Sequence, residues 1–229
     1  RGHEMVGIRL DSGDLNYLSR EARKILDEYG LENAAIAASG DLDEHIIASL
    51  KQQGAPISVW GVGTRLSTGH DDPALNGVYK LTALRDEDGR WQPRIKVSDQ
   101  TAKITTPGRL QVRRFRRDSL AVVDAIYDED FGVSDRCTVV DPADSTRRKK
   151  VPEGCESEDL LVRVFEAGRC VYEAPAAHEA RERCKAELNG LHRDIKRRMN
   201  PHQYPAGLES GLNDFRTKLI MEARQSSQV

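Results

Sequence analysis

The sequence opens on a repeated pattern: a short apolar run ends in small polar residues, and a segment with helical spacing follows. The apolar runs occupy residues 5–10, 34–39 and 56–62. Between them, apolar residues recur at helical intervals up to Gly30 and up to Gly54, which predicts two helices that end at these glycines. Strands that alternate with helices are typical of a parallel α/β sheet. Because the runs are continuously apolar, we expect strands buried on both faces.

Small polar residues follow each predicted strand directly. The first run ends at "DSGD", residues 11–14, the second at Gly40–Asp41, and the third leads into "GVGT", residues 61–64. In parallel α/β proteins, ligands bind at the carboxyl ends of the strands, where helix N-termini present free N–H groups. One polar turn is ordinary, but three in succession favour a binding site.

The residue types in these clusters suit a phosphorylated sugar. Gly61 and Gly63 let backbone N–H groups approach an anion, and Thr64 adds a hydroxyl donor. Asp11 and Asp41 can accept hydrogen bonds from paired ribose hydroxyls, or hold Mg²⁺ through water. The alternative for Gly61, Gly63 and Thr64 is an ordinary turn.

Arg9 and the aspartates also have structural explanations. Arg9 is a guanidinium on an otherwise apolar strand, so it requires either an anionic ligand or an internal ion pair. Asp41 precedes Glu44 at the spacing of a helix-capping box, which would make it a cap on its helix. The alternative for Asp11, Ser12, Gly13 and their neighbour Asp14 is a surface loop.

Missing motifs and the charge balance exclude several classes of function. The sequence has no complete G-x-G-x-x-G dinucleotide fingerprint and no G-x-S-x-G nucleophile elbow. "HEARE" has Glu182 where a zinc protease has its second histidine. The formal net charge is -2, so we expect the basic runs at 113–117, 147–150 and 196–198 to be solvated surface rather than a nucleic-acid interface. No apolar run reaches the roughly 18–20 residues that a membrane helix needs.

Cysteine and histidine spacing predicts no metal site. Cysteines 137, 155, 170 and 184 form no C-x-x-C pair, so we expect no zinc. Reduced thiols are expected of a cytosolic protein, and the alternative that the spacing leaves open is a disulfide. His45 lies on a predicted helix and His70 stands beside Asp71 and Asp72, without ligand spacing.

Four segments in the first 110 residues resemble the nicotinate phosphoribosyltransferase family: "GHEMVGIRLDSGDLNYLSREARKILDEYG", "IAASGDLDE", "VWGVGTRLSTGHDDPALNGVYKL" and "KITTPG". The resemblance returns near the C-terminus in "YPAGLESGLNDFRTKLIMEAR", whereas residues 126–200 are less distinctive. Several motifs in the same order make this resemblance far more specific than any one of them.

The resemblance implies an α/β fold that is part of an irregular TIM-like barrel, as in type II phosphoribosyltransferases, with a β-rich accessory segment and C-terminal helices. It implies an enzyme that joins nicotinate to phosphoribosyl pyrophosphate, giving nicotinate mononucleotide and pyrophosphate, with Mg²⁺ as cofactor and ATP as co-substrate. The implied setting is cytoplasmic NAD salvage by a homodimer, without nucleic-acid or membrane partners. Alternatives are a related enzyme that uses another base such as nicotinamide, and a truncated chain with a binding or regulatory role.

The resemblance also implies roles for individual residues. Arg9 would face the pyridine ring and its carboxylate, and Asp11 would hold the ribose or the reacting region of the ring. Gly40 and Asp41 would contact the ribose hydroxyls, and the 5′-phosphate would lie against the third cluster. The expected catalytic pair is Arg9 and Asp11, no residue is expected as a direct metal ligand, and the expected substrate-binding set is Arg9, Asp11, Ser12, Gly13, Ser39, Gly40, Asp41, Gly61, Gly63 and Thr64.

We expect three segments along the chain. Residues 1–73 would form the C-terminal half of the barrel, residues 74–125 a β-rich accessory segment, and residues 126–229 a loop-rich segment with C-terminal helices. In the family, the histidine that ATP phosphorylates and the aromatic residue that stacks on the ring lie upstream of the matching region. The resemblance therefore implies a C-terminal half without turnover of its own.

Within the last segment, the local patterns predict four pieces. Residues 128–158 are polar and predict a loop, whereas residues 160–168 predict a strand. A charged helix is expected over about 175–199, and another after Pro205.

Overall fold

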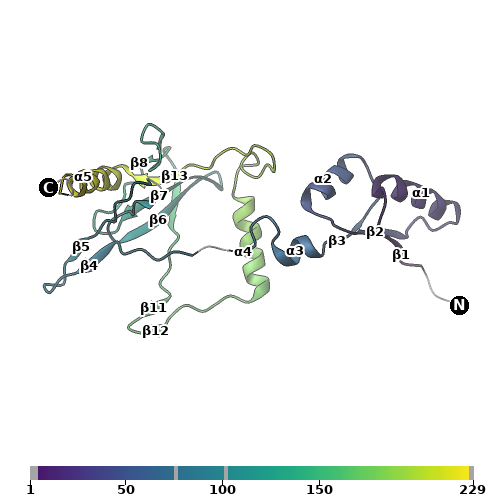
Figure 1. Cartoon of the computed structure of the whole chain (residues 1–229), viewed down its shortest axis with the longest axis horizontal. Coiled ribbons are helices and arrows are strands. Elements are labelled where there is room, and N and C mark those ends of the chain that lie inside the picture. The colour runs from purple at the N-terminus through teal and green to yellow at the C-terminus, as the bar shows by residue number, and fades with distance from the viewer. Residues whose placement is uncertain (1–4, 75–76, 101–102, 227–229) are drawn as a thin grey trace. The chain divides into compact units, whose positions relative to one another are not determined.

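The computed structural model describes residues 5–74, 77–100 and 103–226, and the chain divides into two compact units, residues 1–78 and 79–229. Each unit has its own sheet (Figure 1). Each unit also has its own hydrophobic core. The fold is mixed α/β, and the sheets of the described residues are open rather than closed into a barrel. Across these same residues, no helix is long and apolar enough to cross a bilayer.

The first unit is a parallel three-stranded sheet in the order β1-β2-β3. The strand–helix–strand–helix–strand order expected from the sequence is confirmed. Gly30 and Gly54 follow the two long helices with φ of 70° and 73°, the left-handed conformation that ends helices. The elements in chain order are β1 (Gly7–Leu10), α1 (Leu15–Glu28), β2 (Ala35–Ser39), α2 (Glu44–Gln52), β3 (Val59–Gly61) and α3 (Thr64–Thr68).

Helices cover one face of this sheet. α1 and α2 lie on the same side of the strands (Figure 1), and Ile36 and Ala38 of β2 are buried in a core with Leu26 of α1. On the other face, Val59 is 50% exposed and Arg9 is exposed. The expectation of strands buried on both faces is therefore wrong, because successive side chains point to opposite faces and the helices of this unit pack on only one.

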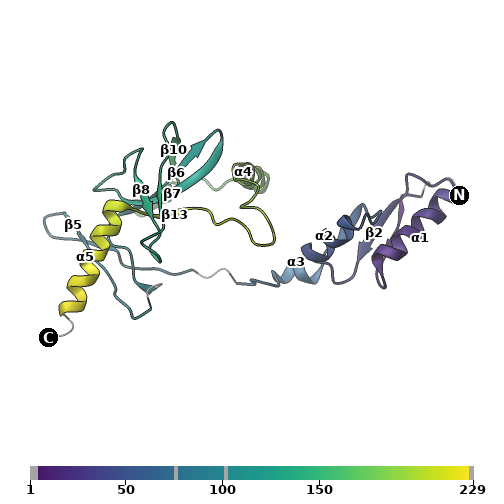
Figure 2. The same cartoon turned by 90° about the horizontal axis from the view of Figure 1, so that it is seen from above.

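The second unit is built on a six-stranded sheet in the order β10-β6-β7-β13-β8-β9. These strands are β6 (Leu110–Arg117), β7 (Leu120–Asp128), β8 (Thr138–Val140), β9 (Arg148–Lys150), β10 (Glu156–Asp159) and β13 (Ala206–Glu209). Two small hairpins pair β4 (Ala83–Arg85) with β5 (Trp91–Pro93), and β11 (Phe165–Glu166) with β12 (Arg169–Cys170). The helices are α4 (Ala177–Asn189) and α5 (Ser210–Ser226), and α5 continues directly from β13 (Figure 2).

The β6–β7 hairpin is the centre of this unit. Asp118 and Ser119 connect the two strands with φ of 51° and 66°, the positive values whose twist matches a tight hairpin. Phe115 and Val123 lie opposite each other across the two strands, in the core of this unit, with no exposed surface. Residue 125, where a segment boundary was expected, lies inside β7, so this strand runs through both expected segments.

Two expectations for the chain beyond β7 are wrong in position. The strand expected at 160–168 lies earlier, as the acidic β10, and only Phe165–Glu166 is strand within the expected range. β10 pairs with the arginine-rich β6, and opposite charges across the ladder stabilise this pairing. The expected loop at 128–158 also contains β8 and β9.

The charged helix expected up to residue 199 ends much earlier. α4 stops at Asn189, and Gly190 donates its backbone N–H to the carbonyl of Ala186. The carbonyl of Gly190 then accepts the N–H of Ala121 at 2.7 Å, which holds the chain at the start of β7 and prevents the helix from continuing. The helix expected after Pro205 is confirmed as α5, with β13 between the proline and the helix.

Cys137 is expected to react with iodoacetamide at pH 8 about a hundredfold more slowly than Cys170 or Cys184, because the thiolate is the nucleophile. Burial raises the pKa of the Cys137 thiol to about 11, whereas Cys170 and Cys184 are exposed. Peptide mass spectrometry over a labelling time course measures the three rates. In urea the rates should become equal, and equal rates in the native protein would contradict the buried position of Cys137.

Candidate active site

The three polar clusters meet at one edge of the first sheet. β1, β2 and β3 are parallel, and their register sets Leu10 beside Ala38 and Ser39 beside Gly61. The strands therefore end side by side. The structure brings the clusters together in the way that their strand order predicts.

A chain of hydrogen bonds links Arg9, Ser39 and Asp11. Arg9 Nη1 donates to Ser39 Oγ at 2.9 Å, and Ser39 Oγ donates to Asp11 Oδ1 at 2.7 Å. Arg9 Nη2 lies 3.4 Å from Asp11 Oδ2, and the two side chains are 65% and 56% exposed. Arg9 thus has the internal ion pair that its strand position requires, yet its guanidinium remains open to an anion. Ser12 and Gly13 follow in the exposed turn before α1.

The turn after β2 is held in the left-handed region of backbone space. Gly40 has φ of 98°, and a Cβ added there would lie 2.6 Å from the carbonyl oxygen of Asp11. Only glycine allows the two strand ends to approach so closely. Asp41 follows with φ of 46°, an uncommon conformation for a residue with a side chain and one that often occurs at functional sites.

Asp41 is not the cap of α2, so the capping-box explanation is wrong. Asp43 caps this helix, because its Oδ1 accepts the backbone N–H of His45 at 2.9 Å and of Ile46 at 2.8 Å. These bonds, the one from Ile46 above all, lower the pKa of the Asp43 carboxyl. Asp14 caps α1 in the same way. The caps therefore use two aspartates outside the candidate set.

The third cluster offers accessible backbone at the start of α3. A Cβ added to Gly61 would lie 3.2 Å from Ser39 Cβ, so this glycine allows β3 to pack closely on β2. A Cβ added to Gly63 would meet no described atom within 4 Å. Thr64 is the first residue of α3. An anion can approach the backbone here, as a phosphate cradle requires.

The structure also groups possible metal ligands that spacing in the sequence did not reveal. Ligand atoms of Glu44, His45 and Asp71 lie within 4.8 Å of one another, and all three residues are exposed. Glu44 and His45 belong to α2, whereas Asp71 follows α3, so the chain had to fold before these groups met. Exposed acidic groups of this kind are common without a metal, and we assign this one no function.

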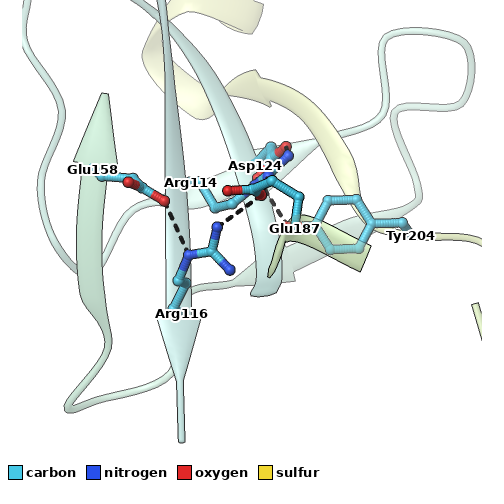
Figure 3. Close-up of polar contacts among 6 residues, drawn as sticks. All are labelled: Arg114, Arg116, Asp124, Glu158, Glu187 and Tyr204. Atoms are coloured by element: carbon cyan, nitrogen blue, oxygen red, sulfur yellow. Dashed lines mark hydrogen bonds and ion pairs between the residues drawn. The ribbon is translucent and has the colours of Figure 1, made fainter. Parts of the chain in front are cut away.

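Carboxylates neutralise Arg114 and Arg116 of the basic run on β6 (Figure 3), so the expectation of a solvated surface is wrong for these two residues, whereas Arg117 is exposed as expected. Arg114 donates to both carboxylate oxygens of Asp124, at 2.9 and 2.8 Å, and to Glu187 at 2.7 Å. Arg116 donates to Glu158 and to Glu187, each at 2.9 Å. The two arginine side chains are only 19% and 20% exposed. These arginines connect β6 with β7, β10 and α4.

Two comparisons with known proteins, one with a family model and one with individual relatives, test the resemblance stated above. Residues 109–216 match the family model described as the nicotinate phosphoribosyltransferase C-terminal domain. A nicotinate phosphoribosyltransferase of Bacillus subtilis (strain 168) is 43% identical over 223 residues, which make up 96% of this chain and 45% of that protein. The resemblance to nicotinate phosphoribosyltransferases is confirmed.

Other nicotinate phosphoribosyltransferases extend the likeness. The one from Homo sapiens is 30% identical over 228 residues, covering 92% of this chain and 40% of that protein. The crystal structure of human nicotinic acid phosphoribosyltransferase superposes with a TM-score of 0.69 at 25% identity, covering 95% of this chain and 41% of the other. This chain therefore spans less than half the length of the nicotinate phosphoribosyltransferases that it matches.

Proposed function

We propose that this chain is part of a nicotinate phosphoribosyltransferase, which joins nicotinate and phosphoribosyl pyrophosphate to give nicotinate mononucleotide and pyrophosphate, with ATP hydrolysis, in NAD salvage. The observation that carries the proposal is the linked Arg9, Ser39 and Asp11 at the carboxyl edge of a parallel sheet. This edge is the place where α/β enzymes bind phosphorylated ligands. The family likeness supplies the substrates.

Arg9 binds the nicotinate carboxylate in this proposal. Its guanidinium donates one hydrogen bond to Ser39 and lies beside Asp11, and its remaining N–H donors are accessible to a ligand. A guanidinium and a carboxylate form paired, charge-assisted hydrogen bonds, which orient as well as bind. Orientation brings the ring nitrogen toward the anomeric carbon of the ribose at short range, and such positioning removes much of the entropic barrier.

Asp11 and Asp41 interact with the ribose in this proposal. Departure of pyrophosphate leaves positive charge on the ribose, as in glycosyl transfer, and a fixed carboxylate near that charge stabilises it. We assign Asp11 to the reacting region of the ribose and Gly40 with Asp41 to the ribose hydroxyls. Ser39 holds the Asp11 carboxylate through its hydroxyl, so Ser39 is a positioning residue.

The 5′-phosphate and Mg²⁺ complete the proposal. The phosphate binds at the start of α3, to Gly61, Gly63 and Thr64. Ser12 and Gly13 lie after β1, at the same edge of the sheet, and belong to the substrate-binding set. The carboxylate oxygens of Asp11 and Asp41 are hard, solvent-accessible donors that fit Mg²⁺ held through water. Mg²⁺ bound there would stabilise the charge of the leaving pyrophosphate. ATP enters as co-substrate on the resemblance alone.

The finer architecture follows from the same proposal. The three-stranded sheet would be part of the TIM-like barrel of type II phosphoribosyltransferases, with residues 1–73 as its C-terminal half. Residues 74–125 would form the β-rich accessory segment, and residues 126–229 the loop-rich segment and C-terminal helices. We propose a cytoplasmic homodimer, with nicotinate, phosphoribosyl pyrophosphate and ATP as small-molecule partners.

The test is formation of nicotinate mononucleotide by the longest natural form of the protein that contains this chain. Asp11→Asn removes the charge beside the ribose and keeps the shape, so kcat/KM should fall at least tenfold. Arg9→Gln should raise the KM for nicotinate more than the KM for phosphoribosyl pyrophosphate. Glu28→Gln is the matched control, because Glu28 is an exposed carboxylate at the far end of α1.

Two outcomes would count against this assignment. If the folded protein makes no product from nicotinate but uses nicotinamide, the substrate would be nicotinamide and the related enzyme would replace this assignment. An Asp11→Asn variant with the turnover of the Glu28→Gln control would remove the strand edge from the reaction.

A further inference from the structure

Residues 161–175 of the second unit form an exposed arm, which we call the hairpin arm. It contains β11 and β12, and Figure 1 shows this hairpin between two long connections without strand or helix. Ala167 and Gly168 join the strands with φ of 48° and 78°, the positive values of a tight two-residue turn. Every residue of the arm except Tyr172 is exposed.

Both faces of the hairpin arm carry apolar side chains. Phe165 lies opposite Cys170, and the next pair, Val164 and Val171, points to the other face. A two-stranded hairpin alone is marginally stable in water and requires a further strand or a packed face. The large apolar residues of the arm expose roughly 500 Å² together, as much as the largest apolar patch of a typical monomer. They are Leu161, Val162, Val164, Phe165 and Val171.

The outer edge of β12 has backbone groups available for a further strand. The N–H of Val171 donates to the carbonyl of Val164 at 2.8 Å, so the backbone of Val171 faces β11. Since successive residues direct these groups to opposite sides of a strand, Cys170 and Tyr172 direct theirs to the outer edge. Only the Cys170 thiol contacts the Tyr172 carbonyl, at a long 3.5 Å. Among the described residues, no third strand pairs with this hairpin.

The free edges of the larger sheet differ from this one. β9 and β10 are its outermost strands, and their sequences, "RKK" and "ESED", are charged. Charged side chains protect an edge strand from pairing with other chains. The sequence "RCVYE", which begins with β12 and covers residues 169–173, has charges only at its two ends and Val171 at its centre.

The residues 169–173 are complementary to a second copy of themselves. If two such segments run antiparallel with Val171 opposite Val171, Arg169 of each copy lies opposite Glu173 of the other. Within residues 5–74, 77–100 and 103–226, neither of these two charges has an ion-pair partner. The same register sets Cys170 opposite Tyr172, the two residues whose backbone groups face outward. The charge pattern and the backbone direction therefore select the same register independently.

We propose that β12 pairs with β12 of a second copy, centred on Val171, and joins the two hairpins into one four-stranded antiparallel sheet. Ion pairs between Arg169 and Glu173 flank the central valines on both sides, and opposite charges across a ladder stabilise such a pairing. The contact uses the same surface of both copies, so it closes at a dimer. The two arms bring roughly 1,000 Å² of exposed apolar surface to it, a large part of the about 1,600 Å² that a standard interface buries.

This contact rests on the homodimer of the proposed function, for which it supplies an interface, but not on the reaction. Cross-linking tests it without any measurement of turnover. A negative result would therefore leave the assignment of the reaction unchanged.

The experiment measures disulfide cross-linking through Val171→Cys in the longest natural form of the protein that contains this chain. Cys170→Ser and Cys184→Ser remove the exposed thiols. In the proposed register the two introduced side chains are a directly opposed pair with Cβ atoms about 5 Å apart, near the span of a disulfide. Under mild oxidation, covalent dimers joined at position 171 should form at least tenfold faster than in the control variant.

Val162→Cys in the same background is the matched control. Val162 is an exposed valine of the same arm, and its replacement leaves residues 169–173 intact. In the four-stranded sheet the two thiols at position 162 lie three strand spacings apart or more, over about 14 Å, too far for a disulfide. A rate at position 171 no higher than at position 162 would overturn the proposal, because random collision would then explain both.

Charge reversal tests the register. Arg169→Glu sets like charges opposite each other at both ends of the contact, so cross-linking through Val171→Cys should slow at least tenfold. Adding Glu173→Arg should restore the rate, because the opposite charges meet again. Continued protection of the buried Cys137 thiol shows that each variant is folded. An unchanged rate after Arg169→Glu would also overturn the proposal, since the strands would not meet in this register.

Discussion

Replacing Gly108 with alanine is expected to lower the free energy of unfolding of the second unit by about 4 kcal/mol, as the sum of backbone strain and overpacking. Gly108 has φ of 105°, and an added Cβ would lie 1.9 Å from Asp128 Oδ2. Asp128 cannot move away easily, because it is 3% exposed and its Oδ1 accepts the N–H of Asp130 at 2.9 Å. The methyl group therefore displaces either the loop before β6 or the end of β7.

Gly132→Ala is the matched control for this prediction. Gly132 also has positive φ, 70°, but a Cβ there would meet no described atom within 4 Å. It should cost only the backbone strain, about 1 kcal/mol. Labelling of the buried Cys137 thiol across a urea series reports unfolding of this unit specifically. Equal losses in both variants would show that the loop before β6 yields without resistance.

The order of elements in the first unit could be predicted from the sequence because its signals are local. Apolar runs of a few residues and the glycines after each helix are read from neighbouring positions alone. β10 could not be predicted in this way. Its residues, Glu156–Asp159, are acidic and have no apolar pattern, and they form a strand because β6 presents Arg113–Arg116 opposite them. The signal for this strand lies about forty positions away in the chain.

The candidate site divides along the same line. The meeting of the three clusters follows from parallel pairing, so the strand order was sufficient to predict it. The Ser39 hydroxyl between Arg9 and Asp11 depends on the exact register of β1 and β2, which no local pattern specifies. The choice of Asp43 over Asp41 as the cap depends on the left-handed turn at Gly40. Backbone geometry decided where residue type left two choices.

Among these long-range contacts, we expect the ion pairs of β6 to contribute most to the stability of the second unit. Arg114→Met is expected to destabilise the second unit by about 3 kcal/mol, because it leaves the buried Asp124 carboxylate without its cation. Asp124 is 8% exposed, and Arg114 supplies two of its hydrogen bonds, at 2.9 and 2.8 Å. Tyr204 supplies a third hydrogen bond, which the variant keeps but which cannot replace the lost positive charge.

Arg136→Met tests whether burial is the cause. Arg136 pairs with Glu153 at 2.7 Å, but the two side chains are 66% and 74% exposed, so its loss should cost under about 1 kcal/mol. Urea unfolding followed by Cys137 labelling measures both variants on the same unit. Similar losses would show that water reaches Asp124 and that the network does not hold β6 to β7. A large loss for Arg114→Met alone would establish that Arg114 is structural and that its burial beside Asp124 is the cause.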